Sequence, residues 1–127
     1  MTKKSNILYI NDILDNMNKI QKYTEGYNFD TFLKDEKTQD SVVLCIFKIG
    51  EAAKNLSKNI DNIETKYPGI SWKDIIKMRD LIGHHYDAIE YDKLWNTIQD
   101  DIPKEKPYIE KLYEELKKEW ELSKDEK

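Results

Sequence analysis

Five residues with chemically useful side chains fall within one short stretch of the chain: Arg79, Asp80, His84, His85 and Tyr86. The stretch contains both histidines of the protein. A guanidinium binds phosphate oxygens well, and an imidazole can accept or donate a proton near neutral pH. An arginine that holds a phosphate beside a histidine that moves a proton is a combination suited to cleaving a phosphodiester.

The position of Arg79 on its predicted helix is unusual. At about 100° per residue, Arg79 falls inside an apolar stripe rather than on the polar face. The residues that form this stripe are Trp72, Ile75, Ile76, Met78, Ile82 and Tyr86. Arginine keeps its charge and is rarely buried without a partner. Arg79 therefore requires a carboxylate, a subunit boundary or a bound anion, and position alone favours a structural ion pair.

His84 lies five residues after Arg79, which is about 140° around a straight helix. Gly83 directly precedes His84, and glycine often ends a helix in a left-handed conformation. We therefore expect the helix to stop or distort near Gly83. This would leave His84 free to swing toward Arg79.

Two residues of the preceding helix could also contribute to a site. Glu51 borders an apolar stripe and could pair with a buried arginine, although its position favours a solvated role. Cys45 is the only cysteine and lies in an apolar run, where packing is its usual role. A single cysteine permits no disulfide within the chain, which fits a reducing cytoplasm.

Apolar residues that recur every three or four positions predict a mostly helical chain. Ser71 and Asp74 have the spacing of a capping box at the start of the helix that carries Arg79. The expected architecture is all-α, with one up-and-down bundle over residues 1–122 and a frayed charged tail at 123–127. The expected helices cover about residues 5–23, 28–33, 38–59, 71–83, 94–102 and 106–122, with ends at Gly26, near Gly83 and at Pro103.

Composition excludes several classes of protein. Charged residues make up 36% and hydrophobic residues 39% of the 127, which indicates one globular domain. The longest apolar run has six residues and no signal peptide is visible, so we expect a cytoplasmic protein without a membrane span. The net charge of −4 argues against a general nucleic-acid coat protein, but it permits a local basic patch around Lys73 and Lys77. Neither a zinc-type ligand spacing nor a glycine-rich phosphate loop is present, so we expect no metal and no cofactor.

The sequence resembles the HepT-like toxins of the HEPN superfamily of prokaryotic ribonucleases. Arg79, His84 and Tyr86 match the Arg-x4-His-x-Tyr motif of these proteins. Ile-Gly-Glu-Ala-Ala-Lys-Asn-Leu-Ser, at residues 49–57, resembles the family's IGEAAKxLS block. Similar blocks precede and follow the motif, at residues 70–76 and 94–103, so that the likeness covers roughly residues 7–103.

The resemblance implies a helical homodimer whose two motifs face one cleft, and RNA cleavage without a metal. Arg79 would bind the scissile phosphate, and His84 would act as general base or acid. Asp80 would orient one of them. The expected products are a 2′,3′-cyclic phosphate and a 5′-hydroxyl. The resemblance also implies a toxin whose nucleotidyltransferase antitoxin silences it by transferring AMP to Tyr86, with tRNA or mRNA as the substrate.

One position departs from the motif and leaves an alternative open. A second histidine, His85, stands between the motif histidine and tyrosine, and an Arg79–His85 pair also fits the broader spacing of the superfamily. His84 is preferred because only that choice leaves Tyr86 in place, but His85 could share or replace its role.

Two other functions compete with the toxin. One is a non-catalytic helical module that binds a nucleotide or docks a nucleotidyltransferase. The other is a domain in which Arg79, His84 and Tyr86 form a buried polar network within one subunit, closed to solvent.

Overall fold

A computed structural model describes the chain from residue 2 to residue 125, except for the side chains of Thr2, Tyr86 and Asp125. Four long helices form the framework: α1 (Thr2–Tyr23), α3 (Glu36–Asn59), α5 (Trp72–His84) and α7 (Ile102–Asp125). Shorter helical segments connect them: α2 (Phe29–Leu33), α4 (Ile63–Lys66), η1 (Tyr86–Ala88), α6 (Tyr91–Asn96) and η2 (Thr97–Asp101). No strand occurs between residues 2 and 125.

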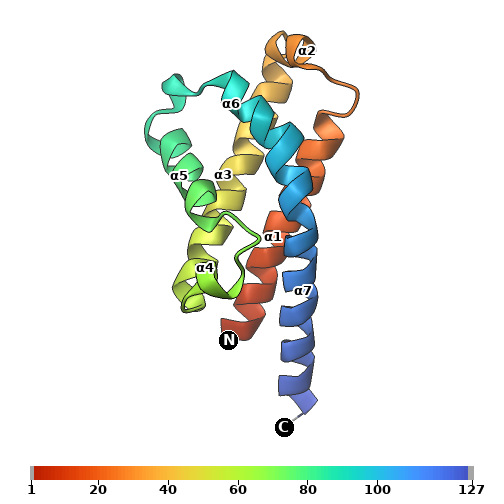
Figure 1. Ribbon diagram of the computed structural model, residues 1–127, viewed down its shortest axis with the longest axis vertical. Coiled ribbons are helices and arrows are strands. Elements are labelled where there is room, and N and C mark those ends of the chain that lie inside the picture. The colour runs from red at the N-terminus through yellow and green to blue at the C-terminus, as the bar shows by residue number, and fades with distance from the viewer. Residues whose placement is uncertain (1, 126–127) are drawn as a thin grey trace.

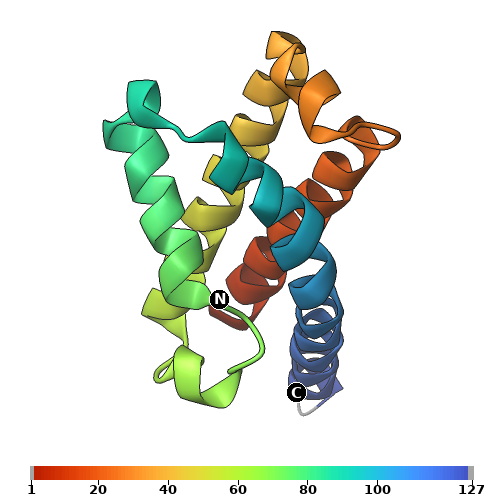
Figure 2. The same ribbon diagram turned by 45° about the horizontal axis from the view of Figure 1, so that its top comes forward.

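The long helices alternate in direction along the bundle (Figures 1 and 2). α1 packs against both α3 and α7, and α5 packs against the other side of α3. Both chain ends lie at the same end of the bundle (Figure 1). The predicted all-α, up-and-down architecture is therefore confirmed.

Apolar side chains at helical spacing fill the centre of this bundle. The largest fully buried ones are Ile10, Ile13, Ile20, Phe32, Val42, Leu56, Trp72, Ile109 and Leu112. Removing such side chains from water is the main favourable contribution to folding. Cys45 is part of the same core, and burial raises the pKa of its thiol. Its surroundings are those of a packing residue rather than a reactive cysteine.

The ends of the first two helices follow their local sequence. α1 ends at Tyr23, and Gly26 then adopts a left-handed φ of 79° in the turn that follows. Asn28 caps α2, because its side-chain oxygen accepts a hydrogen bond of 2.9 Å from the amide of Thr31. Both features were predicted from these residues.

The last part of the chain differs from the sequence prediction. The expected helix end at Pro103 is wrong, because α6, η2 and α7 follow one another without a break, as the cyan-to-blue rod in Figure 1 shows. η2 is a π-helical turn in which the Ile102 amide bonds to the Thr97 carbonyl, five residues back. We attribute this wider turn to Pro103, which lacks an amide hydrogen and would crowd the carbonyl four residues earlier. α7 then continues to Asp125, three residues beyond the predicted end at Leu122.

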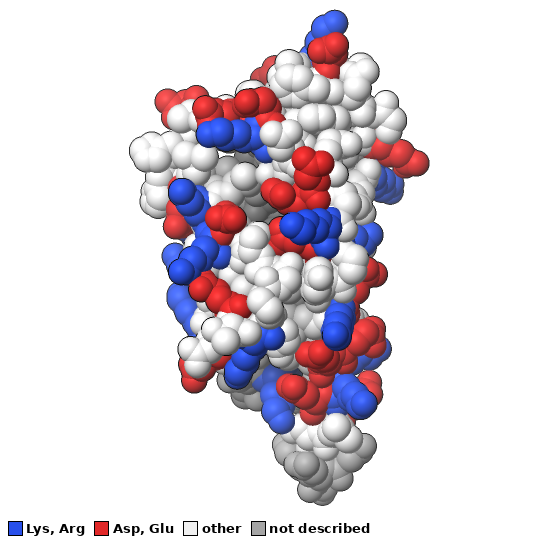
Figure 3. All heavy atoms as spheres, viewed as in Figure 1, with Lys and Arg blue, Asp and Glu red and all other residues white. Residues whose placement is uncertain are grey.

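Charged residues of both signs are mixed over the face seen in Figure 3, without a broad area of one sign. No helix among the described residues is long and apolar enough to cross a membrane.

Candidate active site

The candidate site forms where α5 crosses α3. Gly50 lies at the contact, and a Cβ atom built on it would approach the Cβ of Arg79 to 2.1 Å and the Ile75 carbonyl oxygen to 3.2 Å. The two helices can therefore come this close only because residue 50 has no side chain. Gly50 therefore sets how closely Arg79 approaches α3.

Arg79 has two carboxylate partners and one aromatic neighbour. Its Nη1 donates a 2.8 Å hydrogen bond to Asp80, and its Nε donates to Glu51 on α3. The guanidinium carbon also lies 5.3 Å from the centre of the Phe47 ring, a favourable cation–π geometry. The hydrogen bonds that Arg79 donates to Asp80 and Glu51 raise the pKa of its guanidinium.

These contacts decide between the alternatives that the sequence left open for Arg79 and Glu51. Within one protomer, carboxylates satisfy the charge of Arg79, as the structural ion pair requires. The prediction of a solvated Glu51 is wrong, because this side chain pairs with Arg79 across the helix crossing. Glu51 is therefore part of the site, although its own side chain remains 42% exposed.

Asp80 lies among several positive charges. Its hydrogen bond with Arg79 is the main reason that the pKa of its carboxyl is lowered, and Lys54 and His84 lower it further. Lys54 belongs to α3, one turn beyond Glu51, whereas His84 ends α5. Asp80 thus bonds to the motif arginine and lines the same groove as the motif histidine.

The two histidines are at the end of α5 and are both exposed. The predicted helix end near Gly83 is close, but its mechanism is wrong: Gly83 remains helical and α5 ends at His84. Gly26 is the described glycine with a left-handed φ. The closed, buried network is also wrong for His84, since its side chain faces solvent.

His84 and His85 open onto a groove of about 600 Å³ beside α5. The groove is also lined by Lys77, Asp80 and Lys93, but not by Arg79, which lies toward α3. The structure therefore bonds Arg79 to Asp80 and places Asp80 and His84 in one groove, while no hydrogen bond among the described residues joins Arg79 to His84. Tyr86 begins η1, and since its side chain lies outside the described part of the chain, its relation to Arg79 stays a prediction.

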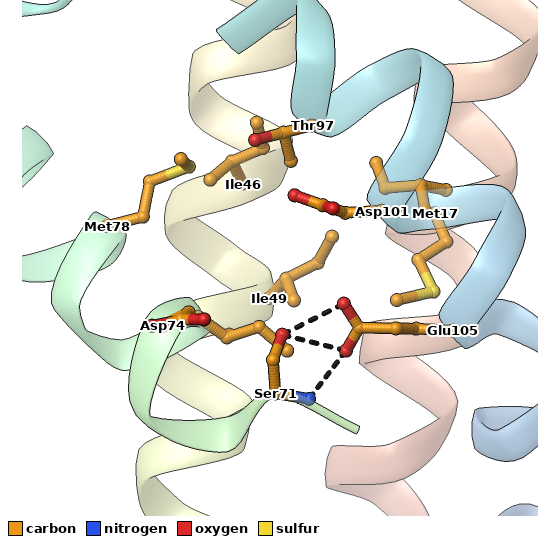
Figure 4. Close-up of a pocket in the computed structure, with 11 residues that line it drawn as sticks. Met17, Ile46, Ile49, Ser71, Asp74, Met78, Thr97, Asp101 and Glu105 are labelled. Carbon is orange, nitrogen blue, oxygen red and sulfur yellow. Dashed lines mark hydrogen bonds between the residues drawn. The ribbon is translucent and has the colours of Figure 1, made fainter. Parts of the chain in front are cut away.

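A smaller cavity of about 60 Å³ adjoins this groove, and Asp74 and Met78 of α5 line both (Figure 4). Its apolar wall includes Ile46, Ile49 and Met78. At its edge, both oxygens of Glu105 accept hydrogen bonds of 2.8 and 2.9 Å from the Ser71 hydroxyl.

The predicted capping box of Ser71 and Asp74 is therefore wrong. Ser71 precedes α5 but makes no side-chain capping bond. Instead, its hydroxyl and its amide both donate to Glu105, which is 7% exposed. A buried carboxylate needs donors more than the half-exposed first turn of a helix does. The tertiary contact consequently replaces the local one.

We expect Ser71→Ala to lower the free energy of unfolding by about 1–3 kcal/mol. The variant removes the hydroxyl that donates to buried Glu105. The backbone amide of residue 71 still donates to that carboxylate, at 2.6 Å. Urea unfolding monitored by circular dichroism measures the change. Ser41→Ala is the matched control, because the exposed Ser41 hydroxyl bonds only to the Lys37 carbonyl within its own helix. Equal midpoints for the two variants would contradict a stabilising role for the Ser71–Glu105 contact.

No group of three or more histidine, cysteine, aspartate or glutamate side chains that could hold a metal ion occurs among the described residues.

The fold and the motif together define an all-helical protein with an Arg-x4-His-x-Tyr site. The family described as "Ribonuclease HepT-like" matches residues 13–112. A protein of Methanocaldococcus jannaschii named "Putative RNase" is 38% identical over 123 residues, which cover 97% of this chain and 99% of the relative. A "Probable ribonuclease HepT" of Thermococcus cleftensis is 36% identical over 110 residues, 87% of this chain and 97% of the relative. No solved structure gives a significant match.

The chain therefore belongs to the HepT-like ribonuclease family. The family resemblance inferred from the motif blocks is confirmed.

Proposed function

We propose that this protein is a metal-independent endoribonuclease and the toxin of a cytoplasmic toxin–antitoxin pair. The observation that carries the proposal is the position of Arg79, which is fixed at a helix crossing with His84 one turn further along α5. Family membership supports RNA as the substrate. The specific RNA, tRNA or mRNA, is open to experiment.

The proposed reaction is an attack of a ribose 2′-hydroxyl on the adjacent phosphorus. The new bond joins the 2′-oxygen to phosphorus while the bond to the leaving 5′-oxygen breaks. Arg79 stabilises the extra negative charge on the phosphate oxygens in the transition state. His84 accepts the 2′-hydroxyl proton or donates one to the 5′-oxygen. The products are a 2′,3′-cyclic phosphate and a 5′-hydroxyl.

We further propose that two protomers combine to form the working site. Within one protomer Arg79 donates to Glu51 and Asp80 and to neither histidine, so a single copy does not pair the phosphate-binding arginine with a histidine. A symmetric dimer would supply two histidines to one cleft. Sedimentation at micromolar concentration tests this, since a monomer would count against a composite site.

The antitoxin is proposed to be a nucleotidyltransferase that transfers AMP to the Tyr86 hydroxyl, forming a phosphodiester and releasing pyrophosphate from ATP. A phosphoryl group added beside Arg79 and His84 would compete with RNA for the same charges. Intact mass after co-expression tests this step, with Tyr86→Phe as the control. A discrete AMP shift that persists in the phenylalanine variant would exclude Tyr86 as the acceptor.

The ribonuclease itself is tested by incubating purified protein with total RNA, tRNA and mRNA in the presence of EDTA. Cleavage by the wild type, with cyclic-phosphate ends and with no cleavage by Arg79→Ala, is the expected result. Cleavage that requires an added divalent ion would overturn the metal-independent mechanism.

A second candidate function rests on the same ion pairs. Arg79 is matched by two carboxylates, Glu51 and Asp80, so this cluster carries no net positive charge to attract RNA. A non-catalytic module that binds a nucleotide or docks a transferase would suit this arrangement. That candidate requires transferase binding by a protein that cleaves no RNA in any condition.

A further inference from the structure

The carboxylate of Asp80 pairs with Arg79 and lines the groove beside α5. Arg79 donates to it at 2.8 Å. His84, at the end of α5, lines the same groove as Asp80, and the charges of Lys54 and His84 both lower the pKa of the Asp80 carboxyl. Carboxylate and phosphate oxygens both form charge-assisted hydrogen bonds with such cations. The Asp80 carboxylate therefore occupies a position on Arg79 that a phosphate oxygen could take.

The hydrogen bond between Arg79 and Asp80 can be replaced more easily than the one between Arg79 and Glu51. Neighbouring residues of a helix do not face one another, so this contact requires the two side chains to bend together. The Asp80 side chain is 48% exposed and that of Glu51 is 42% exposed, so water reaches both carboxylates and the difference between them is one of geometry. Glu51 approaches Arg79 from a different helix, at the crossing that Gly50 makes possible. Glu51 is therefore the anchoring partner and Asp80 the replaceable one.

We propose that Lys54 is a phosphate-binding residue of this site and that Asp80 is a placeholder, which the substrate phosphate displaces from Arg79. The proposal rests on the proposed function, because it assumes a nucleic-acid phosphate at Arg79. Lys54 is partly buried on α3, three residues after Glu51, so it lies on the same side of that helix. A phosphate held by Arg79 in place of Asp80 would lie between α3 and α5, within reach of this lysine.

The proposal assigns opposite effects to two charge-removing variants. Lys54→Gln removes a cation that binds phosphate, and so weakens RNA binding. Asp80→Asn removes the competing anion while keeping the size of the side chain, and so strengthens RNA binding. If Asp80 instead only orients Arg79 or His84, its replacement weakens binding or leaves it unchanged. The direction of the Asp80→Asn effect therefore separates a placeholder from an orienting residue.

The test measures binding of a single-stranded 2′-O-methyl RNA oligonucleotide to the full-length protein by fluorescence anisotropy over a range of salt concentrations. The blocked 2′-oxygen prevents cleavage, so affinity is measured independently of catalysis. Matched controls carry the same charge changes elsewhere: Lys58→Gln, one turn further along α3, and Asp61→Asn in the turn after it. Both control side chains are exposed.

We expect Lys54→Gln to weaken binding on the order of threefold to tenfold and to reduce the salt dependence by about one counterion. Asp80→Asn should tighten binding by a similar factor, and both controls should stay near the wild type. The proposal is overturned if Lys54→Gln matches Lys58→Gln, if Asp80→Asn fails to tighten binding, or if the wild type binds no RNA.

Cleavage of unmodified RNA, measured in parallel, keeps this proposal distinct from the proposed function. If the two variants change RNA affinity as expected but the wild type cleaves no RNA, the phosphate site stands and the ribonuclease proposal is wrong. If the wild type cleaves RNA but the Lys54 and Asp80 variants bind RNA as tightly as it does, the ribonuclease proposal stands and the placeholder role of Asp80 is wrong.

Discussion

We expect His84→Ala to lower the rate of RNA cleavage by about 10²- to 10⁴-fold, the usual contribution of a general acid or base. His84 is exposed at the end of α5 and no hydrogen bond of its side chain supports the fold among the described contacts. Substitutions at such positions usually change stability by less than about 0.5 kcal/mol. If cleavage is lost while the thermal midpoint and the sedimentation coefficient stay unchanged, the defect lies in the cleavage reaction and not in folding or assembly.

His85→Ala is the matched control for this experiment. His85 is also exposed, and the bond that it makes in closing α5 comes from its backbone amide, which donates to the Leu81 carbonyl at 2.7 Å. Alanine keeps that bond. A large loss in the His85 variant with little loss in the His84 variant would transfer the proton-moving role to His85. Full cleavage by both variants would exclude a histidine mechanism.

Helical periodicity and local turn residues predicted most of the framework. Side chains that repeat every three or four positions have only one face on which to bury themselves, so α1, α3 and α5 could be located from sequence. Gly26 and Asn28 act on their immediate neighbours, and their effects were also predictable. These features depend on contacts over a few residues.

The errors arose where a contact spans a long stretch of sequence. Ser71 has the local pattern of a capping residue, but a buried carboxylate 34 residues later takes its hydroxyl. Pro103 reads as a helix end, yet Ile98, Ile102 and Ile109 keep burying the same stripe on either side of it. Burial of that stripe outweighs the loss of one backbone hydrogen bond, and the π turn accommodates the ring.

The site was predicted in its residues but not in its internal contacts. Arg79 and His84 were named from their spacing and Asp80 from the family resemblance, whereas the pairing of Arg79 with Glu51 joins residues 28 positions apart. A signal for it was present, because Gly50 directly precedes Glu51. A glycine in the middle of an apolar helix face often permits close approach of another helix, and an adjacent acid is then carried toward that helix.

We expect Gly50→Ala to disturb both the stability and the site of the protein. The new Cβ would meet the Arg79 Cβ at 2.1 Å, its Cγ at 2.7 Å and the Ile75 carbonyl at 3.2 Å. Because the contacts include backbone and the stiff base of a side chain, α5 must move away from α3. Overpacking of this kind costs about 1–3 kcal/mol, and it also carries the guanidinium of Arg79 away from Glu51. Urea unfolding and RNA cleavage measure the two consequences.

Gly83→Ala adds a methyl group to the other helix of this pair, and we expect it to raise stability rather than lower it. Its Cβ would lie 3.4 Å from a Phe47 ring carbon, an ordinary contact, and Gly83 is helical. Alanine at such a position stabilises a helix by about 0.5–1 kcal/mol. If the crossing at Gly50 sets the site, the Gly50 variant loses cleavage in proportion to the displacement of Arg79, even at temperatures where it remains folded. A Gly50 variant that is less stable but fully active when folded would show that the crossing supports the bundle and not the position of the arginine.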